Sequence, residues 1–363
     1  MPTARSRFQG CLLAGAVGDA LGAAVEFMQW PAIQAKYGPS GIREFDISYG
    51  RRGAITDDTQ MTLFTAEGLL RGHIRGSARG ILDWGSMLGG AYHRWLLTQG
   101  EKPPRAVASR VPTDGCLFGL ASLHSRRAPG NTCLQALRTT PAGTPAKNQS
   151  KGCGGVMRVA PVGLYAWAQR GANGIAHAFE LGCEAAALTH SHATGFLSAG
   201  VLSTVIHQLA DGSTLDAALD AAMRLLAARD EHAETLDVLQ RSRELAKLQP
   251  DADITELGQG WIAEEALAMS VFIALTAVDM ESALRRAANH SGDSDSTGSI
   301  AGNLLGTMWG VEAIPDRWVA DVELSDEIRA VADDLLDSQA WDFDGSAPPV
   351  SRPEQTWNRY PGH

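Results

Sequence analysis

Aromatic residues and cysteines are scarce in this sequence, and long apolar runs are absent. Aromatic side chains make up 6% of the 363 residues, whereas 39 residues are glycine, which lets helices and ligands approach the backbone closely. The five cysteines are odd in number and form no Cys-x-x-Cys pair. This pattern argues against a disulfide framework or a zinc site and indicates a reducing compartment such as the cytoplasm. Because no run of 18 apolar residues occurs, we expect no membrane-spanning helix.

Positive charge is also in deficit, with a formal net charge of −10 at pH 7. This balance argues against a broad nucleic-acid interface. The hydrophobic share of 44% and the charged share of 20% are typical of a globular protein. The apolar stretch at residues 11–17 follows Arg5 and Arg7 and resembles a short signal peptide, but Asp19 soon interrupts it. We therefore favour a helix of the folded protein at this place.

Apolar residues recur at helical spacing along most of the chain, and no strand-like alternation recurs, which predicts an all-α fold. Helices are predicted near residues 5–27, 59–72, 77–97, 116–124, 131–138, 172–229, 232–247, 262–276, 281–290 and 298–310. Loops rich in glycine and proline are predicted at 28–55 and 139–155. Length alone suggests two or three domains. The acidic clusters described next favour one domain over residues 1–340, followed by a loosely packed tail over residues 341–363.

Two adjacent aspartates between hydroxyl residues form the first candidate site, Thr56-Asp57-Asp58-Thr59. Adjacent carboxylates repel each other, so they need either solvent or a cation that holds both charges. Threonine and aspartate supply hard oxygen ligands, which suit Mg²⁺, Mn²⁺ or Ca²⁺. Thr56 is equally suited to cap a following helix. The stretch by itself therefore leaves a metal site and a plain helix cap open.

A second oxygen-rich stretch contains Asp293, Asp295, Ser296 and Thr297. Two such clusters at distant positions are what a two-metal site between helices needs. If both contribute to one site, the two ends of the chain meet in one domain. An EF-hand loop is the competing interpretation, but its twelfth position is Leu304, where a bidentate glutamate belongs. We therefore reject the EF-hand.

Three further features are ambiguous by themselves. Glu26 lies between apolar residues near a predicted helix end, and its local sequence favours a surface glutamate. The glycine-rich turn at residues 152–155 precedes a helix and could bind phosphate through backbone N–H groups, although a plain turn is at least as consistent. His190 and His192 cannot share a helix face, so capping or ligand contact is favoured over a metal pair.

In this order and at this spread, the motifs resemble those of the ADP-ribosylglycohydrolase family, of the dinitrogenase-reductase-activating type. The motifs are GCLLAGAVGDALG at 10–22 with Glu26, TDDT at 56–59, GGVMRVAP at 154–161, TH at 189–190 and GDSDSTG at 292–298. The resemblance implies an all-α, orthogonally packed, multi-helix single domain with a dinuclear metal cleft. It also implies two Mg²⁺ ions, or Mn²⁺, bound by Thr56, Asp57, Asp58, Asp293, Asp295 and Ser296. The family usually has Asp-Thr-Asp-Thr in the last motif, and serine keeps the oxygen ligand, with Thr297 as the alternative to Ser296.

The resemblance further implies roles for individual residues and an activity. The expected catalytic residues are Glu26, Asp58 and Asp293. The expected substrate-binding residues, at the diphosphate and the ribose, are Gly152, Gly154, Gly155, Met157, Arg158 and His190. The implied reaction is removal of ADP-ribose from a modified protein, first from arginine, which would reverse regulatory or toxin-catalysed modification. Hydrolysis of serine-linked ADP-ribose or free ADP-ribose esters, or non-catalytic binding of ADP-ribose or a toxin, are the alternatives. The expected partners are an ADP-ribosylated protein, ADP-ribose and an ADP-ribosylating toxin, with neither nucleic acid nor membrane.

Overall fold

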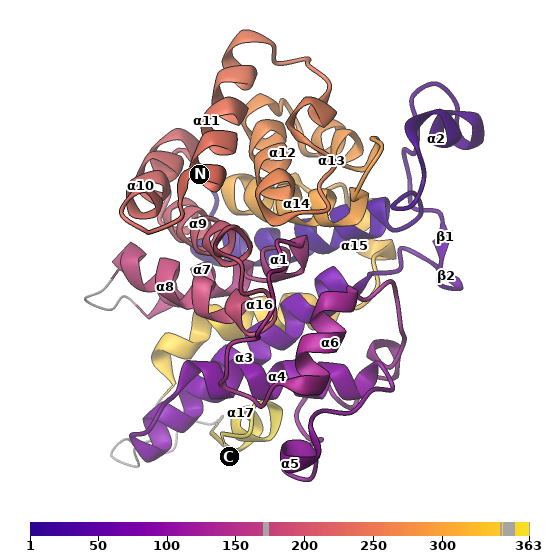
Figure 1. Cartoon of the computed structure of the whole chain (residues 1–363). Helices are drawn as coiled ribbons and strands as arrows, with labels where there is room; N and C mark the ends of the chain where they lie inside the picture. Colours follow the sequence, from indigo (N-terminus) through magenta and orange to yellow (C-terminus); the bar gives the residue numbers. More distant parts are fainter. Residues whose placement is uncertain (170–173, 342, 344–352, 363) are drawn as a thin grey trace.

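The computed structural model describes residues 1–169, 174–341, 343 and 353–362, and almost all regular structure in them is helical (Figure 1). The helices of the first half are α1 (Ala4–Gly22), α2 (Trp30–Tyr37), α3 (Asp57–Arg79), α4 (Trp84–Thr98), α5 (Arg105–Ala108), α6 (Asn131–Thr139), α7 (Ala160–Ala168) and α8 (Gly174–Ala187). Those of the second half are α9 (Ala193–Ala210), α10 (Leu215–Ala227), α11 (Ala233–Leu248), α12 (Ala263–Thr276), α13 (Met280–Ala288), α14 (Ser294–Trp309), α15 (Asp316–Asp321), α16 (Ser325–Asp337) and α17 (Pro353–Arg359). Within the described residues, one antiparallel hairpin pairs β1 (Ile47–Ser48) with β2 (Arg51–Arg52).

Helices α1 and α14 form the central pair of the fold (Figure 1), and they pack against each other at glycine residues. A Cβ atom at Gly18 would lie 2.0 Å from the carbonyl oxygen of Gly298, and one at Gly22 would lie 2.4 Å from the Asp295 Cα atom. The two backbones therefore touch, which only residues without a side chain allow. This contact brings the C-terminal end of α1 to the N-terminal end of α14, so that both ends of the chain belong to one domain.

Helix α3 is longer than its sequence pattern predicts. The pattern predicts a break near Gly72 and a new helix from residue 77, but α3 continues to Arg79 and ends at Gly80, whose φ of 66° is left-handed. The glycine inside the helix serves packing, because a Cβ atom at Gly72 would lie 2.5 Å from the ring of Trp84 in α4. Glycine here permits close approach of α4 and does not end the helix.

Two other segments differ from the predicted pattern. Residues 116–124 contain one 3₁₀ turn, Ala121–Leu123, in place of a helix. The loop predicted at 28–55 contains α2 and the β-hairpin, both of which project from the body of the protein (Figure 1). Pro31 lies in the first turn of α2, a position that proline favours because its missing N–H has no helical partner there. A residue that indicates a loop in the sequence therefore starts a helix.

Helix α9 lies in the core, and α7, α8, α10 and α12 pack against it. Among the described residues it is the one helix that is long and apolar enough to cross a membrane, with a mean hydropathy of 1.2 over 18 residues. However, 89% of this window is buried inside the protein. Its apolar composition is therefore accounted for by the core that it helps to form.

The described end of the chain packs against the domain. Tyr360, which follows α17, is fully buried and donates a hydrogen bond of 2.7 Å to Asp334. The buried guanidinium of Arg71 donates to the Pro361 carbonyl oxygen at 3.3 Å. Residues 353–362 thus differ from the loosely packed tail expected at 341–363, because a large aromatic ring and a backbone carbonyl find partners in the domain. Residues 342, 344–352 and 363 of that segment lie outside the described part of the chain.

Candidate active site

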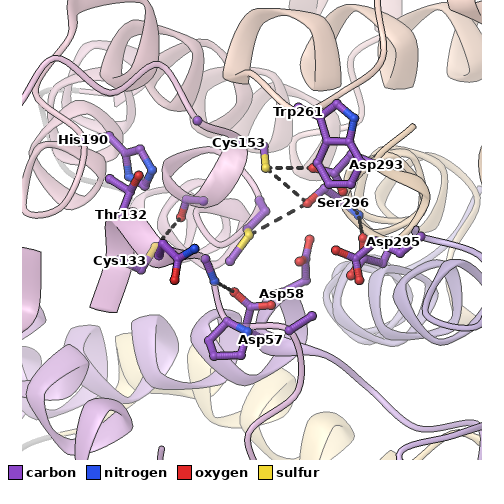
Figure 2. A pocket seen from close by; sticks show the side chains of 18 of the residues that line it. Asp57, Asp58, Thr132, Cys133, Cys153, His190, Trp261, Asp293, Asp295 and Ser296 are labelled. Carbon is purple, nitrogen blue, oxygen red and sulfur yellow. Dashed lines mark hydrogen bonds between the residues drawn. The ribbon is translucent and has the colours of Figure 1, made fainter. Parts of the chain in front are cut away.

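A cavity of about 550 Å³ lies between the N-terminal ends of α3 and α14. Its wall also includes the segment after α1, the loop before α6 and the glycine-rich turn before α7. Two helix N-termini therefore meet at one cavity, and the positive ends of their dipoles favour negative charge there. Figure 2 shows the side chains that face one another across it, Asp57 and Asp58 on one side and Asp293, Asp295 and Ser296 on the other.

The first turn of α3 supplies two aspartates to the cavity. Thr56 caps the helix by accepting the Asp58 N–H at 3.3 Å, and Asp57 accepts the Gly130 N–H at 3.1 Å. Asp58 is almost fully buried, and its Oδ1 atom has no hydrogen-bond partner among the described residues. Because a buried carboxylate oxygen without a partner is costly, the pair fits a bound cation. Thr56 is thus a helix cap, and the same turn also carries the groups of a metal site.

The N-terminal end of α14 faces this pair with a second set of oxygens. Asp293 caps the helix by accepting the Ser296 N–H at 3.3 Å. One carboxylate oxygen each of Glu26, Asp293 and Asp295 lie within 4.8 Å of one another. The Glu26 Oε2 atom is buried and has no hydrogen-bond partner in the part of the chain that the structure describes. The surface position that the local sequence favours for Glu26 is wrong, since its exposed fraction is 7%.

The carboxylates in this cavity raise one another's pKa values. Burial, followed by the charges of Asp295 and Asp293, raises the pKa of Glu26 to about 11. Burial and the charge of Asp295 raise the pKa values of Asp57 and Asp58 well above their usual range. Without compensating positive charge, these groups are held protonated. Hard oxygen donors in this arrangement fit divalent cations such as Mg²⁺ or Mn²⁺, which hold carboxylates ionised.

Asp19 on α1 is a site residue that the sequence analysis does not select. It is fully buried and accepts hydrogen bonds from the N–H groups of Thr56 and Thr59 at 3.0 and 3.1 Å, and from the Thr59 hydroxyl. These bonds fix the first turn of α3 on α1. Burial and the charge of Asp295 raise the pKa of Asp19 to about 7. A lone aspartate inside the small and apolar stretch 10–22 was the available signal, because such a group is costly to bury without partners.

The glycine-rich turn forms the wall next to α14, and residues 152–154 and Met157 line the cavity. His190 lines it as well, and its Nδ1 atom shares a hydrogen bond of 2.8 Å with the Thr189 hydroxyl. Burial, followed by the charge of Arg158, lowers the pKa of His190 to about 3. The imidazole is therefore neutral at pH 7, and its second nitrogen is available for one hydrogen bond to a ligand.

Arg158 is a predicted substrate-binding residue that the structure places outside the cavity, and this expectation is corrected. The side chain is fully buried and donates hydrogen bonds to the Ala185 carbonyl oxygen at 3.0 Å and to the Thr189 hydroxyl at 2.7 Å. Its guanidinium also lies 4.2 Å from the centre of the Tyr92 ring. Because the donors are directed into the core, Arg158 connects helices and holds the residues around His190 in place.

Two more predicted residues lie behind the cavity surface. Gly155 packs against α8, where a Cβ atom at this position would lie 3.0 Å from the Ala186 Cβ atom. Thr56 lies beneath the carboxylates, with its hydroxyl 3.5 Å from the Asp58 Oδ2 atom. Thr56 still places an oxygen beside the acidic cluster. Gly155 allows the turn to pack closely against α8 and does not line the cavity.

The geometry of the turn predicts the effect of replacing Gly154 with alanine. The added Cβ atom would lie 2.8 Å from the Cys133 sulfur and 3.0 Å from the His190 ring, so the turn or His190 must shift. We expect kcat/KM for the substrate that binds in this cavity to fall by about 10- to 100-fold, because displacement of the order of 1 Å has effects of this size. The matched control is Gly119→Ala, where the new Cβ atom meets nothing within 4 Å. Equal kinetics for the two variants would contradict a role of this turn in substrate binding.

Cys153 and two aromatic residues are further cavity residues that the sequence pattern does not indicate. The Cys153 thiol lies 2.9 Å from the Asp293 Oδ2 atom, to which it donates. At the mouth, the rings of Phe27 and Trp261 stack with centres 6.0 Å apart and an interplanar angle of 16°. Their exposed fractions of 72% and 39% are high for large apolar side chains, and such exposure is typical of a surface that meets a ligand.

The fold and the cavity define a class of protein, a single helical domain in which two helix N-termini gather carboxylates around one cavity. The chain belongs to the ADP-ribosylglycohydrolase family, whose sequence model matches residues 1–344. This match confirms the family expected from the motifs and, together with the structural likeness below, the all-α single-domain fold. The protein is accordingly an enzyme of the class that hydrolyses ADP-ribose linkages.

Relatives and a solved structure agree with this assignment. The chain is 30% identical over 351 residues to the ADP-ribosyl-[dinitrogen reductase] glycohydrolase of Rhodospirillum rubrum, covering 92% of this chain and 97% of the relative. It is 23% identical to the ADP-ribosylarginine hydrolase Tri1 of Pseudomonas putida (strain GB-1), covering 92% of this chain and 79% of the relative. A solved ADP-ribosylglycohydrolase-related protein complex superimposes with a TM-score of 0.64 at 24% identity, covering 93% of this chain and 100% of that chain. At this identity the structural likeness shows the fold.

Proposed function

We propose that this protein removes ADP-ribose from modified arginine side chains of proteins in the cytoplasm, with two Mg²⁺ or Mn²⁺ ions as cofactors. The observation that carries the proposal is the meeting of buried carboxylates from two helix N-termini and from Glu26 at one cavity. The names of two relatives, a glycohydrolase for ADP-ribosylated dinitrogen reductase and an ADP-ribosylarginine hydrolase, support the substrate class. Such an activity would reverse a regulatory modification or one made by a toxin.

The candidate metal ligands form two groups, one at the start of each helix. They are Thr56, Asp57 and Asp58 before and in α3, and Asp293, Asp295 and Ser296 before and in α14. When bound, divalent ions of this kind polarise substrate hydroxyls and lower the pKa of a bound water. The buried Oδ1 atom of Asp58 and Oε2 atom of Glu26, both without a partner among the described residues, are the atoms that most directly support this cofactor.

The carboxylates also act on the reacting group itself. Cleavage of the glycosidic bond develops positive charge at C1 of the ribose, and a carboxylate held close by stabilises that charge. Glu26 is our candidate for the general base, because it enters the cavity from the segment after α1 and not from either helix start. With cations bound nearby, its carboxylate would be ionised and able to accept a proton. Asp58 and Asp293 are the further candidates.

The charge balance of the cavity favours the arginine linkage. Six acidic side chains contribute to the cluster, and they are Asp19, Glu26, Asp57, Asp58, Asp293 and Asp295. Two divalent cations would neutralise four of the six charges and leave a negative surplus. ADP-ribosylated arginine retains a cationic guanidinium, which this surplus attracts, whereas serine-linked ADP-ribose and free esters have a neutral leaving group.

The test of the proposal is release of ADP-ribose from two peptides of the same sequence, one modified on arginine and one on serine. With Mg²⁺ we expect release from the arginine peptide at a kcat/KM at least about tenfold above that for the serine peptide, a difference of about 1.4 kcal/mol. A chelator should abolish it, and Mn²⁺ should restore it.

The alternatives predict different results in the same assay. Preferred release from the serine peptide or from a free ADP-ribose ester would overturn the linkage and keep the hydrolase. Tight binding of ADP-ribose without release from any substrate would indicate a module that binds ADP-ribose or a toxin. Release that persists in chelator would remove the metal cofactor from the proposal.

A further inference from the structure

A second cavity of about 670 Å³ lies beside the first. Three short segments, residues 27–30, 259–261 and 290–293, each line the first cavity at one end and the second at the other. Two or three residues of chain span at most about 7 to 11 Å, so a thin wall separates the cavities. The stacked rings of Phe27 and Trp261 belong to this wall. A segment of two to four residues is therefore long enough to span the distance between the two linings.

His290 provides the main sign that the second cavity takes a ligand. Its exposed fraction is 3%, it lines the cavity, and neither of its ring nitrogens makes a well-formed hydrogen bond among the described residues, although the backbone of Ser291 and of Ala287 lies beside the ring. Burial lowers the pKa of His290 to about 4, so the ring is neutral at pH 7 and offers one N–H donor and one acceptor. Because buried polar groups are normally paired, this ring indicates a ligand that completes its hydrogen bonds.

The charges around the cavity favour a cationic ligand. Its other charged lining residues are Asp251, Asp253 and Arg286, and both carboxylates are exposed. The Arg286 guanidinium is already engaged, since it donates to the carbonyl oxygens of Pro250 at 2.9 Å and of Ala252 at 2.6 Å. With a neutral His290, the charge of the lining is therefore negative by one unit. The Asp253 Oδ1 atom already accepts hydrogen bonds from the N–H and the hydroxyl of Thr255 at 2.9 and 2.8 Å, which leaves the exposed Asp251 carboxylate as the main group to meet a ligand.

Trp30 adds an aromatic wall to this acidic cavity. It is partly buried, lies at the start of α2 and lines the cavity together with Pro31. An indole face attracts an ammonium or guanidinium group by about 0.5–1 kcal/mol at exposed sites. The neutral imidazole of His290 can accept an N–H hydrogen bond from the same group. Carboxylate, aromatic ring and imidazole acceptor together recognise a lysine or arginine side chain.

We propose that the second cavity is a subsite for a lysine or arginine of the protein substrate that lies two to four residues from the ADP-ribosylated residue. The spacing follows from the wall, because a peptide of this length spans about the same distance as the chain segments that separate the cavities. The inference rests on the proposed function, since it assumes that the modified residue enters the first cavity. It makes flanking sequence, and not only the linkage, a determinant of substrate choice.

The experiment compares three substrates, namely an ADP-ribosyl-arginine peptide with lysine three residues away, the same peptide with glutamine there, and ADP-ribosyl-agmatine. We expect the protein to hydrolyse the lysine peptide with a kcat/KM about five- to tenfold above that for the glutamine peptide. Asp251→Lys should bring this ratio close to one and leave ADP-ribosyl-agmatine unaffected. Glu256→Lys is the matched control, because it reverses an exposed charge in the neighbouring 3₁₀ turn, outside the cavity lining. Glu256→Lys should therefore show the same ratio of kcat/KM between the lysine and glutamine peptides as the parent protein.

The results separate this inference from the proposed function. A ratio near one in the parent protein, or an equal loss on all three substrates in Asp251→Lys, would overturn the subsite. If neither peptide nor ADP-ribosyl-agmatine were hydrolysed, the result would instead count against the arginine activity. In that case, the subsite is tested by measuring the binding of the unmodified lysine and glutamine peptides by fluorescence anisotropy. Tighter binding of the lysine peptide, lost in Asp251→Lys, would support the subsite. Equal binding of both peptides would refute it.

Discussion

Replacement of Asp58 by asparagine is expected to lower kcat/KM for ADP-ribose release by about 10²–10³-fold and, at the same time, to stabilise the metal-free protein. The loss follows because removal of one partner from a buried ionic pair costs about 3–5 kcal/mol, and the Asp58 Oδ1 atom is buried with no described protein partner. The gain in stability follows because burial, followed by the charges of Asp295 and Asp57, raises the pKa of Asp58, so the ionised group is disfavoured in the metal-free fold and a neutral asparagine avoids that cost.

Both effects can be measured with one pair of variants. In chelator, we expect the unfolding temperature of Asp58→Asn to exceed that of the parent protein by about 2 °C, which corresponds to about 1 kcal/mol. With Mg²⁺ the order should reverse, because the parent gains more from binding the ion. Asp326→Asn is the control, since Asp326 occupies the same second position of helix α16 but is exposed. A variant that lost activity and was also less stable in chelator would show that Asp58 is mainly a structural residue.

Part of this site could be predicted because its signals are local. Thr56 and Asp293 each precede a helix and carry an oxygen that caps it, and capping residues are visible in sequence. The neighbouring aspartates and hydroxyl residues, which are hard oxygen donors, indicate a metal site at the same two helix starts. Glu26 is different, since its own neighbours indicate a surface residue. Its burial depends on the contact of Gly22 with Asp295, which joins segments more than 250 residues apart, and only the motif order of the family indicated its place.

Features that depend on side-chain direction could not be predicted from the residue pattern. Arg158 follows a glycine-rich turn, where a basic residue suggests an anion-binding role, but it points to Ala185 and Tyr92 in the core. The length of α3 is a second case, because whether Gly72 ends a helix or lets α4 approach is decided by the ring of Trp84. In both cases tertiary packing outweighs the local preference.

The helices that carry the buried acids of this cavity are held together by close backbone contacts. The α1–α14 contact leaves no room for a side chain between the backbones at Gly18, so the start of α14 lies directly against α1. Asp19 adds hydrogen bonds to Thr56 and Thr59 and fixes α3 against α1. The fold therefore holds like charges together at a cost in stability, as active sites commonly do, and a bound cation would compensate for that cost.

The stability of the chelated protein is expected to fall as pH rises from 7 to 8, and Glu26 should account for a defined part of the fall. A glutamate in the unfolded chain has a pKa near 4.3, whereas in the folded protein that of Glu26 is raised to about 11. Folding therefore takes up a proton at neutral pH. The resulting stabilisation is complete below pH 4, is lost progressively as pH rises, and is exhausted above pH 11. Linkage gives a slope of about 1.4 kcal/mol per pH unit for one such group.

The window from pH 7 to 8 avoids the main histidine and thiol titrations. The raised pKa values of Asp19, Asp57 and Asp58 also contribute to the fall of the parent protein, so the share of Glu26 is the difference in slope between Glu26→Gln and the parent. Burial lowers the pKa of His190 to about 3 and that of His290 to about 4, and these groups add stability as pH rises only up to about 6.5, the pKa of histidine in an unfolded chain. Buried thiols such as Cys11, whose pKa is raised to about 12, oppose folding mainly above pH 8.5. Chemical denaturation in chelator should show a shallower fall for Glu26→Gln than for the parent protein, and Mg²⁺ should flatten the profile of the parent. Identical slopes for variant and parent would mean that Glu26 is ionised in the metal-free protein. In that case, the acids of the cavity would not raise the pKa of Glu26.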